Sequence, residues 1–176
     1  MFLVISTSLS PKSRSKLLAK HVADLISEQG MEVDYIDLAQ TQLPRCDASS
    51  CYANPVAQEV TAKVSNASGI VLATPVYNYS ICSEAKNLVE LTGKAWEDTV
   101  AGFLCAAGGQ GSYMSVMHLA NSLMLDFRTL IVPRFVYATG AAFAENQIND
   151  SDLLERLSLF ANDFQRVTIA LSQPSS

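Results

Sequence analysis

Short apolar runs alternate along the chain with longer stretches in which apolar residues recur at helical spacing. A run that is apolar at every position is typical of a strand buried on both faces of a parallel sheet. The pattern predicts strands over residues 2–6, 32–38, 69–74, 100–107 and 129–137. It predicts helices over residues 14–29, 56–66, 83–91, 113–128 and 152–171.

Strands that alternate with helices along the chain indicate an α/β fold with a parallel sheet between two helical layers. The length of 176 residues and the hydrophobic content of 49% fit a single domain over residues 1–176. If the strand order is the flavodoxin-like 2-1-3-4-5, the loops after the first, third and fourth strands meet at one sheet edge. We therefore expect these three loops to share one ligand.

Residues 39–55 form the longest stretch without clear periodicity. Long loops in compact domains are commonly functional or poorly ordered. The pattern alone leaves both interpretations of this segment open.

Charge and hydropathy exclude several classes of partner. A formal net charge of -5 works against nucleic-acid binding, because such binding rests largely on Lys and Arg side chains at phosphates. Continuous apolar segments all fall short of the roughly 20 residues that span a bilayer. The apolar start, residues 1–5, also lacks the basic region of a signal peptide. We expect a cytoplasmic protein that binds neither nucleic acid nor membrane.

The positions of the cysteine and histidine residues give little support for a disulfide scaffold or a metal site. The cysteines are too few and too scattered for a disulfide scaffold, and lie at Cys46, Cys51, Cys82 and Cys105. The first two are four residues apart, unlike a zinc or thioredoxin-type pair, so a structural role is favoured over a redox role. His21 and His118 lack partners at metal-ligand spacing, and we expect no metal site.

The loop after the first strand gathers hydroxyl and cationic groups at a helix start. Ser8, Ser13 and Ser15 offer hydroxyl donors and Arg14 offers a planar guanidinium. Together with free N–H groups of the helix, they are typical of a phosphate site. The alternative is a serine-capped helix in a solvated turn. The loop contains no glycine, which disfavours a Walker loop and nucleoside triphosphate hydrolysis.

The loop after the third strand is suited to a flat heterocycle. Pro75 stiffens the chain, Val76 and Tyr77 follow it, and Asn78 tolerates unusual backbone angles. Backbone polar groups and a phenol ring are thereby presented together. The alternative is a simple turn, but the combination favours ligand binding.

The loop after the fourth strand is rich in glycine, with Gly108, Gly109, Gln110 and Gly111. Missing side chains would let a flat ligand approach the backbone. The dinucleotide-binding fingerprint does not fit, because Met114 stands where its third glycine belongs and the loop does not follow the first strand. A glycine-rich turn needed only for helix packing is the alternative.

Taken in order, the serine–arginine loop, residues 74–81 with the following Lys86 and Asn87, and residues 108–111 resemble the NAD(P)H-dependent FMN reductase family. The resemblance implies a flavodoxin-like fold, noncovalent FMN, NADPH or NADH as hydride donor, and a homodimer or homotetramer. It implies three groups of cofactor contacts. The phosphate would be held by Ser8, Arg14 and Ser15, the ring by Pro75, Val76, Tyr77 and Asn78, and the ring edge by Gly108, Gly109 and Gly111.

This chain departs from the family pattern at several positions. Val76 replaces a usual Glu, Tyr79 stands where Gly is common, Cys82 replaces Pro, and Ser112 interrupts a second glycine pair. The phosphate loop is the least altered. These differences leave the substrate and the choice between NADPH and NADH open.

The expected function is an FMN-dependent NAD(P)H oxidoreductase that reduces a small acceptor such as a quinone, free flavin, azo compound or metal ion. Catalytic side chains are not required, because the cofactor carries the redox step and the protein orients it. Backbone N–H groups at Asn78 and Gly109 would stabilise charge on the reduced ring. Two alternatives remain: an FMN electron carrier without its own NAD(P)H turnover, and a protein that binds a non-flavin phosphate ligand.

Overall fold

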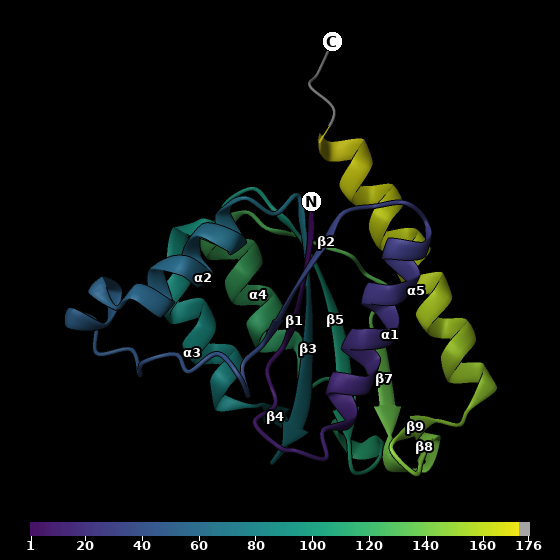
Figure 1. Ribbon diagram of the computed structural model, residues 1–176. Coiled ribbons are helices and arrows are strands. Elements are labelled where there is room, and N and C mark those ends of the chain that lie inside the picture. Colours follow the sequence, from purple (N-terminus) through teal and green to yellow (C-terminus); the bar gives the residue numbers. More distant parts are fainter. Residues whose placement is uncertain (173–176) are drawn as a thin grey trace.

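The computed structural model describes residues 1–172, so the last four residues of the expected domain lie outside the described part (Figure 1). The strands are β1 (Phe2–Ser6), β2 (Val33–Asp37), β3 (Gly69–Tyr77), β4 (Ser80–Ile81), β5 (Val100–Ala107), β6 (Leu130–Ile131), β7 (Val136–Thr139), β8 (Phe143–Ala144) and β9 (Gln147–Ile148). The helices are α1 (Arg14–Glu28), α2 (Pro55–Ser65), α3 (Ser83–Thr92), α4 (Met117–Phe127) and α5 (Ser151–Ser172).

The main sheet confirms the expected strand order. Its strands run β2-β1-β3-β5 in parallel, and β6 and β7 both pair with β5 at the outer edge. Helices α1 and α5 cover one face, whereas α2, α3 and α4 cover the other (Figure 1). The result is a three-layer, flavodoxin-like arrangement with the loops after β1, β3 and β5 at one sheet edge.

The expected fifth strand over residues 129–137 is wrong as a single element. It is divided into β6, which pairs with Val100 and Ala101, and β7, which pairs with residues 104–107. Val132 still donates its N–H to the Ala101 carbonyl, at 2.9 Å, but Pro133 follows it and has no N–H to donate. The sheet edge therefore breaks at the proline and resumes three residues later.

Two element boundaries next to the glycine and tyrosine loops also differ from expectation. Strand β3 continues to Tyr77, and Asn78 and Tyr79 form a two-residue turn into β4 with φ angles of 49° and 64°. Positive φ at both positions is the geometry of a tight hairpin. The helix expected from residue 113 begins at Met117, after a 3-10 turn over Gln110–Ser112.

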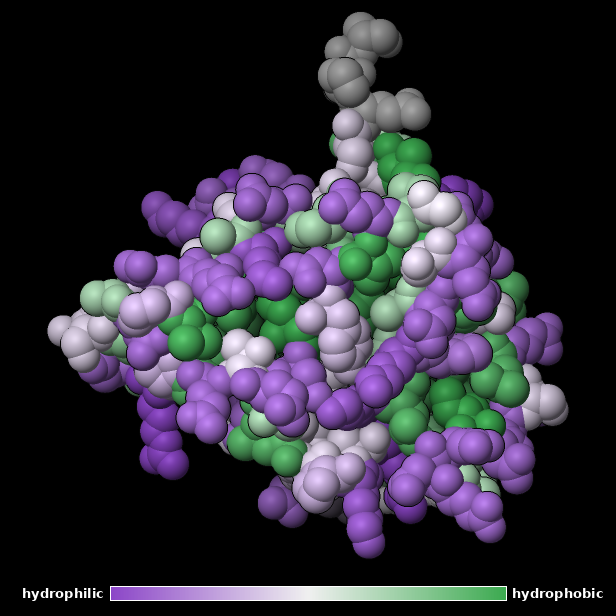
Figure 2. All heavy atoms as spheres, viewed as in Figure 1, coloured by the Kyte–Doolittle hydropathy of each residue, from purple (hydrophilic) through white to green (hydrophobic). Residues whose placement is uncertain are grey.

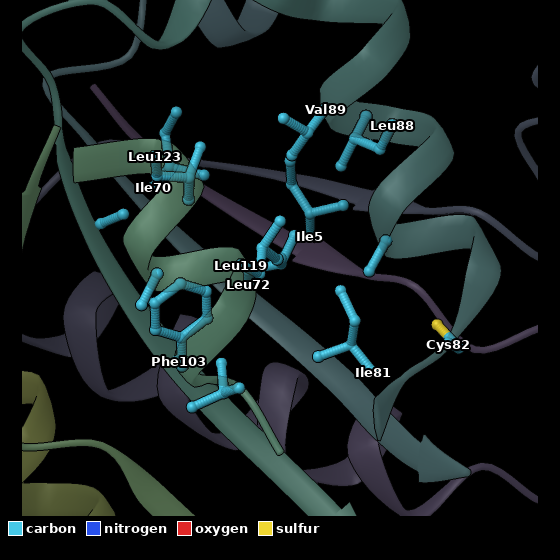
Figure 3. Packing of buried hydrophobic residues seen from close by; sticks show 14 of the residues in the cluster. Ile5, Ile70, Leu72, Ile81, Cys82, Leu88, Val89, Phe103, Leu119 and Leu123 are labelled. Carbon is cyan, nitrogen blue, oxygen red and sulfur yellow. The ribbon is translucent and has the colours of Figure 1, made fainter. Parts of the chain in front are cut away.

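Two hydrophobic clusters fill the space between the sheet and its helical layers. On the α3 and α4 side, Ile5, Leu72 and Phe103 of the sheet lie against Leu88 and Leu119 (Figure 3). The opposite cluster joins the other face of the same strands to α1 and α5. Burial on both faces explains why β1, β3 and β5 are apolar at nearly every position.

Gly102 offers a direct test of packing between β5 and α5. A Cβ atom at this position would lie 2.6 Å from Cζ of Phe160, a fully buried ring. We expect Gly102→Ala to lower the free energy of unfolding by about 1–3 kcal/mol, as overpacking in a close-packed core does. Gly108→Ala is the control, because no atom lies within 4 Å of a Cβ there. Equal denaturation midpoints for the two variants would contradict this packing account.

Hydrophilic side chains dominate the face seen in Figure 2, with smaller apolar patches between them. Among residues 1–172, the helices are all too short or too polar to cross a bilayer.

Candidate functional site

The loop after β1 meets the ends of β3 and β5, where their own loops begin, around a cavity of about 220 Å³. Most of the site residues expected from the sequence line it, namely Ser8, Ser13, Arg14, Ser15, Pro75, Val76, Tyr77 and Gly108. Ser10, Lys12, Ala106 and Ala107 complete the lining. Asn78, Gly109, Gln110 and Gly111 do not line the cavity and lie farther along the same loops. The geometry therefore brings together three segments that are far apart in the sequence.

The first part of the cavity is a set of fixed hydroxyl groups at the start of α1. Ser13 caps this helix by accepting the N–H of Lys16 at 3.1 Å, and its Oγ lies 3.0 Å from Oγ of Ser15. Ser8 and Ser15 are only 2% and 1% exposed, respectively. A helix of this length presents partial positive charge at its start, and its first turn contains no acidic residue. The arrangement suits a phosphate group.

Arg14 reaches from this helix start to the segment after β7. A Cβ atom added at Gly140 would lie 2.6 Å from the Arg14 Nη1 atom. The Arg14 Cζ atom lies 5.8 Å from the ring centroid of Phe143. The missing side chain at Gly140 thus provides space for the guanidinium. Sequence reasoning missed both neighbours, because they lie more than 120 residues away along the chain.

The second part of the cavity is a flat floor at the ends of two adjacent strands. Pro75 of β3 pairs in register with Ala106 of β5, and Val76 and Ala107 are also buried. Tyr77 is 53% exposed at the rim. Small and apolar groups at the same level can receive the face of a planar ring.

The glycine loop leaves open space beside this floor. At Gly108 and Gly109, no atom lies within 4 Å of where a Cβ would stand. Tyr137 of β7 fixes the loop by donating its hydroxyl hydrogen to the Gly109 carbonyl, and its hydroxyl oxygen lies 3.3 Å from Oγ of Ser112. Tyr137 carried no signal in the sequence, because its role depends on pairing between β5 and β7.

A buried polar cluster connects the phosphate loop to the floor. The Cys82 Sγ atom lies 3.1 Å from Oγ1 of Thr7 and 3.5 Å from Oγ1 of Thr74. Thr7 also donates its hydroxyl hydrogen to the Ala73 carbonyl at 3.1 Å. Thr7 and Thr74 immediately precede Ser8 and Pro75 in the sequence. The cluster therefore restrains the segments that begin at these two residues.

The four cysteines are free thiols. Burial raises the pKa of Cys105 to about 12, so this thiol stays protonated at neutral pH. Cys46 is half-buried and lies 3.7 Å from the Tyr52 hydroxyl.

Removing the Tyr137 hydroxyl should loosen the glycine loop without emptying the core. We expect Tyr137→Phe to weaken binding of FMN, the ligand that the sequence resemblance implies, about 2- to 10-fold, since one neutral hydrogen bond contributes about 0.5–1.5 kcal/mol. Fluorescence titration with FMN measures the dissociation constant. Tyr35→Phe is a matched control, because the Tyr35 hydroxyl on β2 has no hydrogen-bond partner among the described residues. An equal loss of FMN affinity in Tyr137→Phe and Tyr35→Phe would contradict a specific role for Tyr137.

The sheet places this chain in the class of flavodoxin-like proteins, and the hydroxyl-lined helix start after β1, with a flat floor beside a glycine loop, suits a phosphorylated planar ligand. Comparison with solved structures agrees on the fold. The NAD(P)H:acceptor oxidoreductase FerB from Paracoccus denitrificans matches with a TM-score of 0.79 at 19% identity, over 96% of this chain and 97% of that one. A WrbA-like flavodoxin from Agrobacterium tumefaciens matches with a TM-score of 0.69 at 14% identity, over 97% and 98%.

Sequence comparison then gives the family. Residues 1–144 match the NADPH-dependent FMN reductase family, and the chain belongs to it. An NADPH:quinone oxidoreductase of Arabidopsis thaliana is 28% identical over 95% of this chain and 91% of its own length. An NAD(P)H-dependent FAD/FMN reductase of Geobacillus thermodenitrificans (strain NG80-2) is 30% identical over 74% and 72%.

Family membership confirms the expected oxidoreductase class, with FMN as cofactor and NADPH as the family's hydride donor. The residues of the cavity fit this group. Buried hydroxyls, two cations and a helix start suit its phosphate, and the flat floor with its open glycine loop suits its ring.

Proposed function

We propose that this chain is an FMN-dependent NAD(P)H oxidoreductase that passes hydride from the nicotinamide to FMN N5 and then reduces a small acceptor. The observation that carries the proposal is one cavity that joins a hydroxyl-lined helix start to a flat floor beside glycines with free space. FMN, when bound, supplies the redox chemistry, and the protein supplies binding and orientation.

The proposed roles of individual residues follow from their positions. Ser8, Ser13, Arg14 and Ser15 hold the phosphate, with Lys12 adding positive charge at the same cavity. Pro75, Val76 and Tyr77 support the ring. Backbone N–H groups of Asn78 and Gly109, on the outer parts of the two loops, stabilise negative charge that develops on the reduced ring. Gln110 and Gly111 keep the ring edge accessible.

We propose a quinone as the first acceptor to test, because relatives are named NADPH:quinone oxidoreductases. Free flavin, azo compounds and metal ions are the other expected acceptors. Exposed aromatic groups at the rim support a planar acceptor, since Tyr77 and Tyr79 are 53% and 76% exposed. A large aromatic surface at the edge of a site favours stacking of flat molecules.

The test is anaerobic stopped-flow mixing of the FMN-loaded protein with NADPH. The proposal expects the visible absorbance of bound FMN to bleach, and to return when a quinone is added. A flavin that stays oxidised at saturating NADPH and NADH would contradict the reductase function. Such a result would favour the alternative of an electron carrier that needs a protein partner.

Three further proposals accompany this function. Residues 1–176 act as one FMN-binding domain, and the protein is cytoplasmic. It assembles as a homodimer or homotetramer, a proposal supported by exposed apolar side chains near α4, such as Met114 at 61% and Leu125 at 83% exposure. Sedimentation of the FMN-loaded protein measures the oligomeric state.

A further inference from the structure

A second cavity, of about 840 Å³, lies beside the FMN site under the long segment after β2. Leu9 lines it, whereas its neighbours Ser8 and Ser10 line the FMN cavity. The loop after β1 is therefore a wall shared by the two cavities. The volume is within the range of sites for small molecules, about 300–1,000 Å³. The function proposed above makes no use of this space.

The segment that roofs the second cavity is anchored by one amide side chain of α3. Asn87 Oδ1 accepts the N–H of Cys46 at 2.8 Å, and Asn87 Nδ2 donates to the Pro44 carbonyl at 2.9 Å. Both the oxygen and the nitrogen of the Asn87 amide are thus hydrogen-bonded to the backbone, on either side of Arg45. These two bonds hold the roof over the cavity, so the cavity is formed before any ligand enters.

The walls combine apolar and polar surfaces. Leu9 is 55% exposed, while Leu38 is buried and Leu43 is partly buried against the core. Thr41 and Gln42 add hydroxyl and amide groups to the same lining. Such a mixture suits a ligand with a flat apolar part and several hydroxyl groups.

The charged groups of the lining leave one cation free. Lys86 is paired with Glu90 at 2.7 Å, so these two charges offset each other. Glu84 accepts a hydrogen bond from the Ser83 hydroxyl at 3.1 Å. Within residues 1–172, Arg45 has neither an ion-pair nor a hydrogen-bond partner. A free guanidinium over a cavity suits a phosphate group.

We propose that this cavity binds the adenosine end of the pyridine nucleotide, with Arg45 contacting the 2'-phosphate of NADPH. The inference rests on the proposed function, because it concerns the donor of the same reaction. Each part of the ligand matches a part of the lining: the purine meets the leucines, the ribose meets Thr41 and Gln42, and the phosphate meets Arg45. The nicotinamide end then lies toward the shared loop and the FMN cavity.

Relatives are named for NADPH, for NADH and for either donor, so donor preference varies among them. The preference must therefore come from residues particular to each chain. Arg45 and Glu84 carry opposite charges and line the same cavity. Replacing each of them should therefore change the dissociation constant for NADPH in opposite directions.

The experiment measures bleaching of bound FMN at increasing concentrations of NADPH, NADH and reduced nicotinamide mononucleotide, which lacks the adenosine end. For the wild-type protein we expect the lowest dissociation constant for NADPH. Arg45→Ala should raise that constant about tenfold, the effect of losing one charge-assisted contact, and leave the other two donors nearly unchanged. Glu84→Gln should lower the constant for NADPH a fewfold, because a like charge is removed.

Arg166→Ala is the matched control, since this arginine lies on α5 and is 77% exposed in its side chain. The inference is overturned if wild-type protein binds all three donors equally, or if Arg45→Ala weakens the truncated donor as much as NADPH. If Arg45→Ala changed only the apparent affinity for the quinone, the cavity would be assigned to the acceptor, and the inference would also be overturned. A flavin bleached by none of the donors would overturn the proposed function itself, a result distinct from these.

Discussion

FMN affinity is expected to fall about a hundredfold or more when Arg14 and Ser15 are both replaced by alanine. A hydrogen bond to a charged group contributes about 1.5–3 kcal/mol, and about 1.4 kcal/mol corresponds to a tenfold change in affinity. Ser15 is 1% exposed beside the Ser13 hydroxyl, and Arg14 carries a cation on the cavity lining. Fluorescence titration of the cofactor-free variant with FMN gives the dissociation constant.

The control for this variant is the pair Arg166→Ala and Ser158→Ala on α5, which removes the same two chemical groups far from the loops. We expect wild-type affinity for the control. Similar thermal melting of the two double variants would show that the fold is retained. If Arg14→Ala with Ser15→Ala bound FMN as tightly as the control, the phosphate assignment would be wrong.

The second large effect is expected at the glycine loop. Gly108→Val should abolish FMN binding, because its branched side chain would occupy the open space beside the floor formed by Pro75 and Ala106. Gly108 has no positive φ angle and no atom lies within 4 Å of an added Cβ, so the fold should survive. The measurement is the visible absorbance retained after purification in the presence of excess FMN.

Ala144→Val, at an exposed position of β8, is the control for adding the same side chain elsewhere. It should keep the absorbance of the wild-type protein. Gly108→Val protein that stays yellow with unchanged affinity would show that the ring does not lie beside this loop.

The fold was largely predictable because the three central strands of the sheet, β1, β3 and β5, are buried on both faces. Their apolar runs are continuous over residues 2–5, 69–73 and 100–107, and a helix lies between each of them and the next strand of the parallel sheet. The incorrect prediction of a single strand over residues 129–137 has a local cause. Pro133 was visible in the sequence, but a proline at a sheet edge interrupts pairing without changing the apolar pattern around it.

The candidate site was predictable to the extent that it depends on strand ends. Parallel strands place their following loops at one edge, so the serine, tyrosine and glycine loops could be grouped before their geometry was known. Tyr137, Gly140 and Phe143 could not be found in this way, because they act across strand pairs and distant loops. Arg45 was missed for a similar reason, since its position depends on the side chain of Asn87.

The most direct test of the central claim is a parallel titration of the cofactor-free wild-type protein with FMN and with riboflavin, which lacks the phosphate. The account predicts that FMN binds at least about a hundredfold more tightly, because two or more charge-assisted contacts depend on the phosphate. Equal dissociation constants for the two flavins would contradict it.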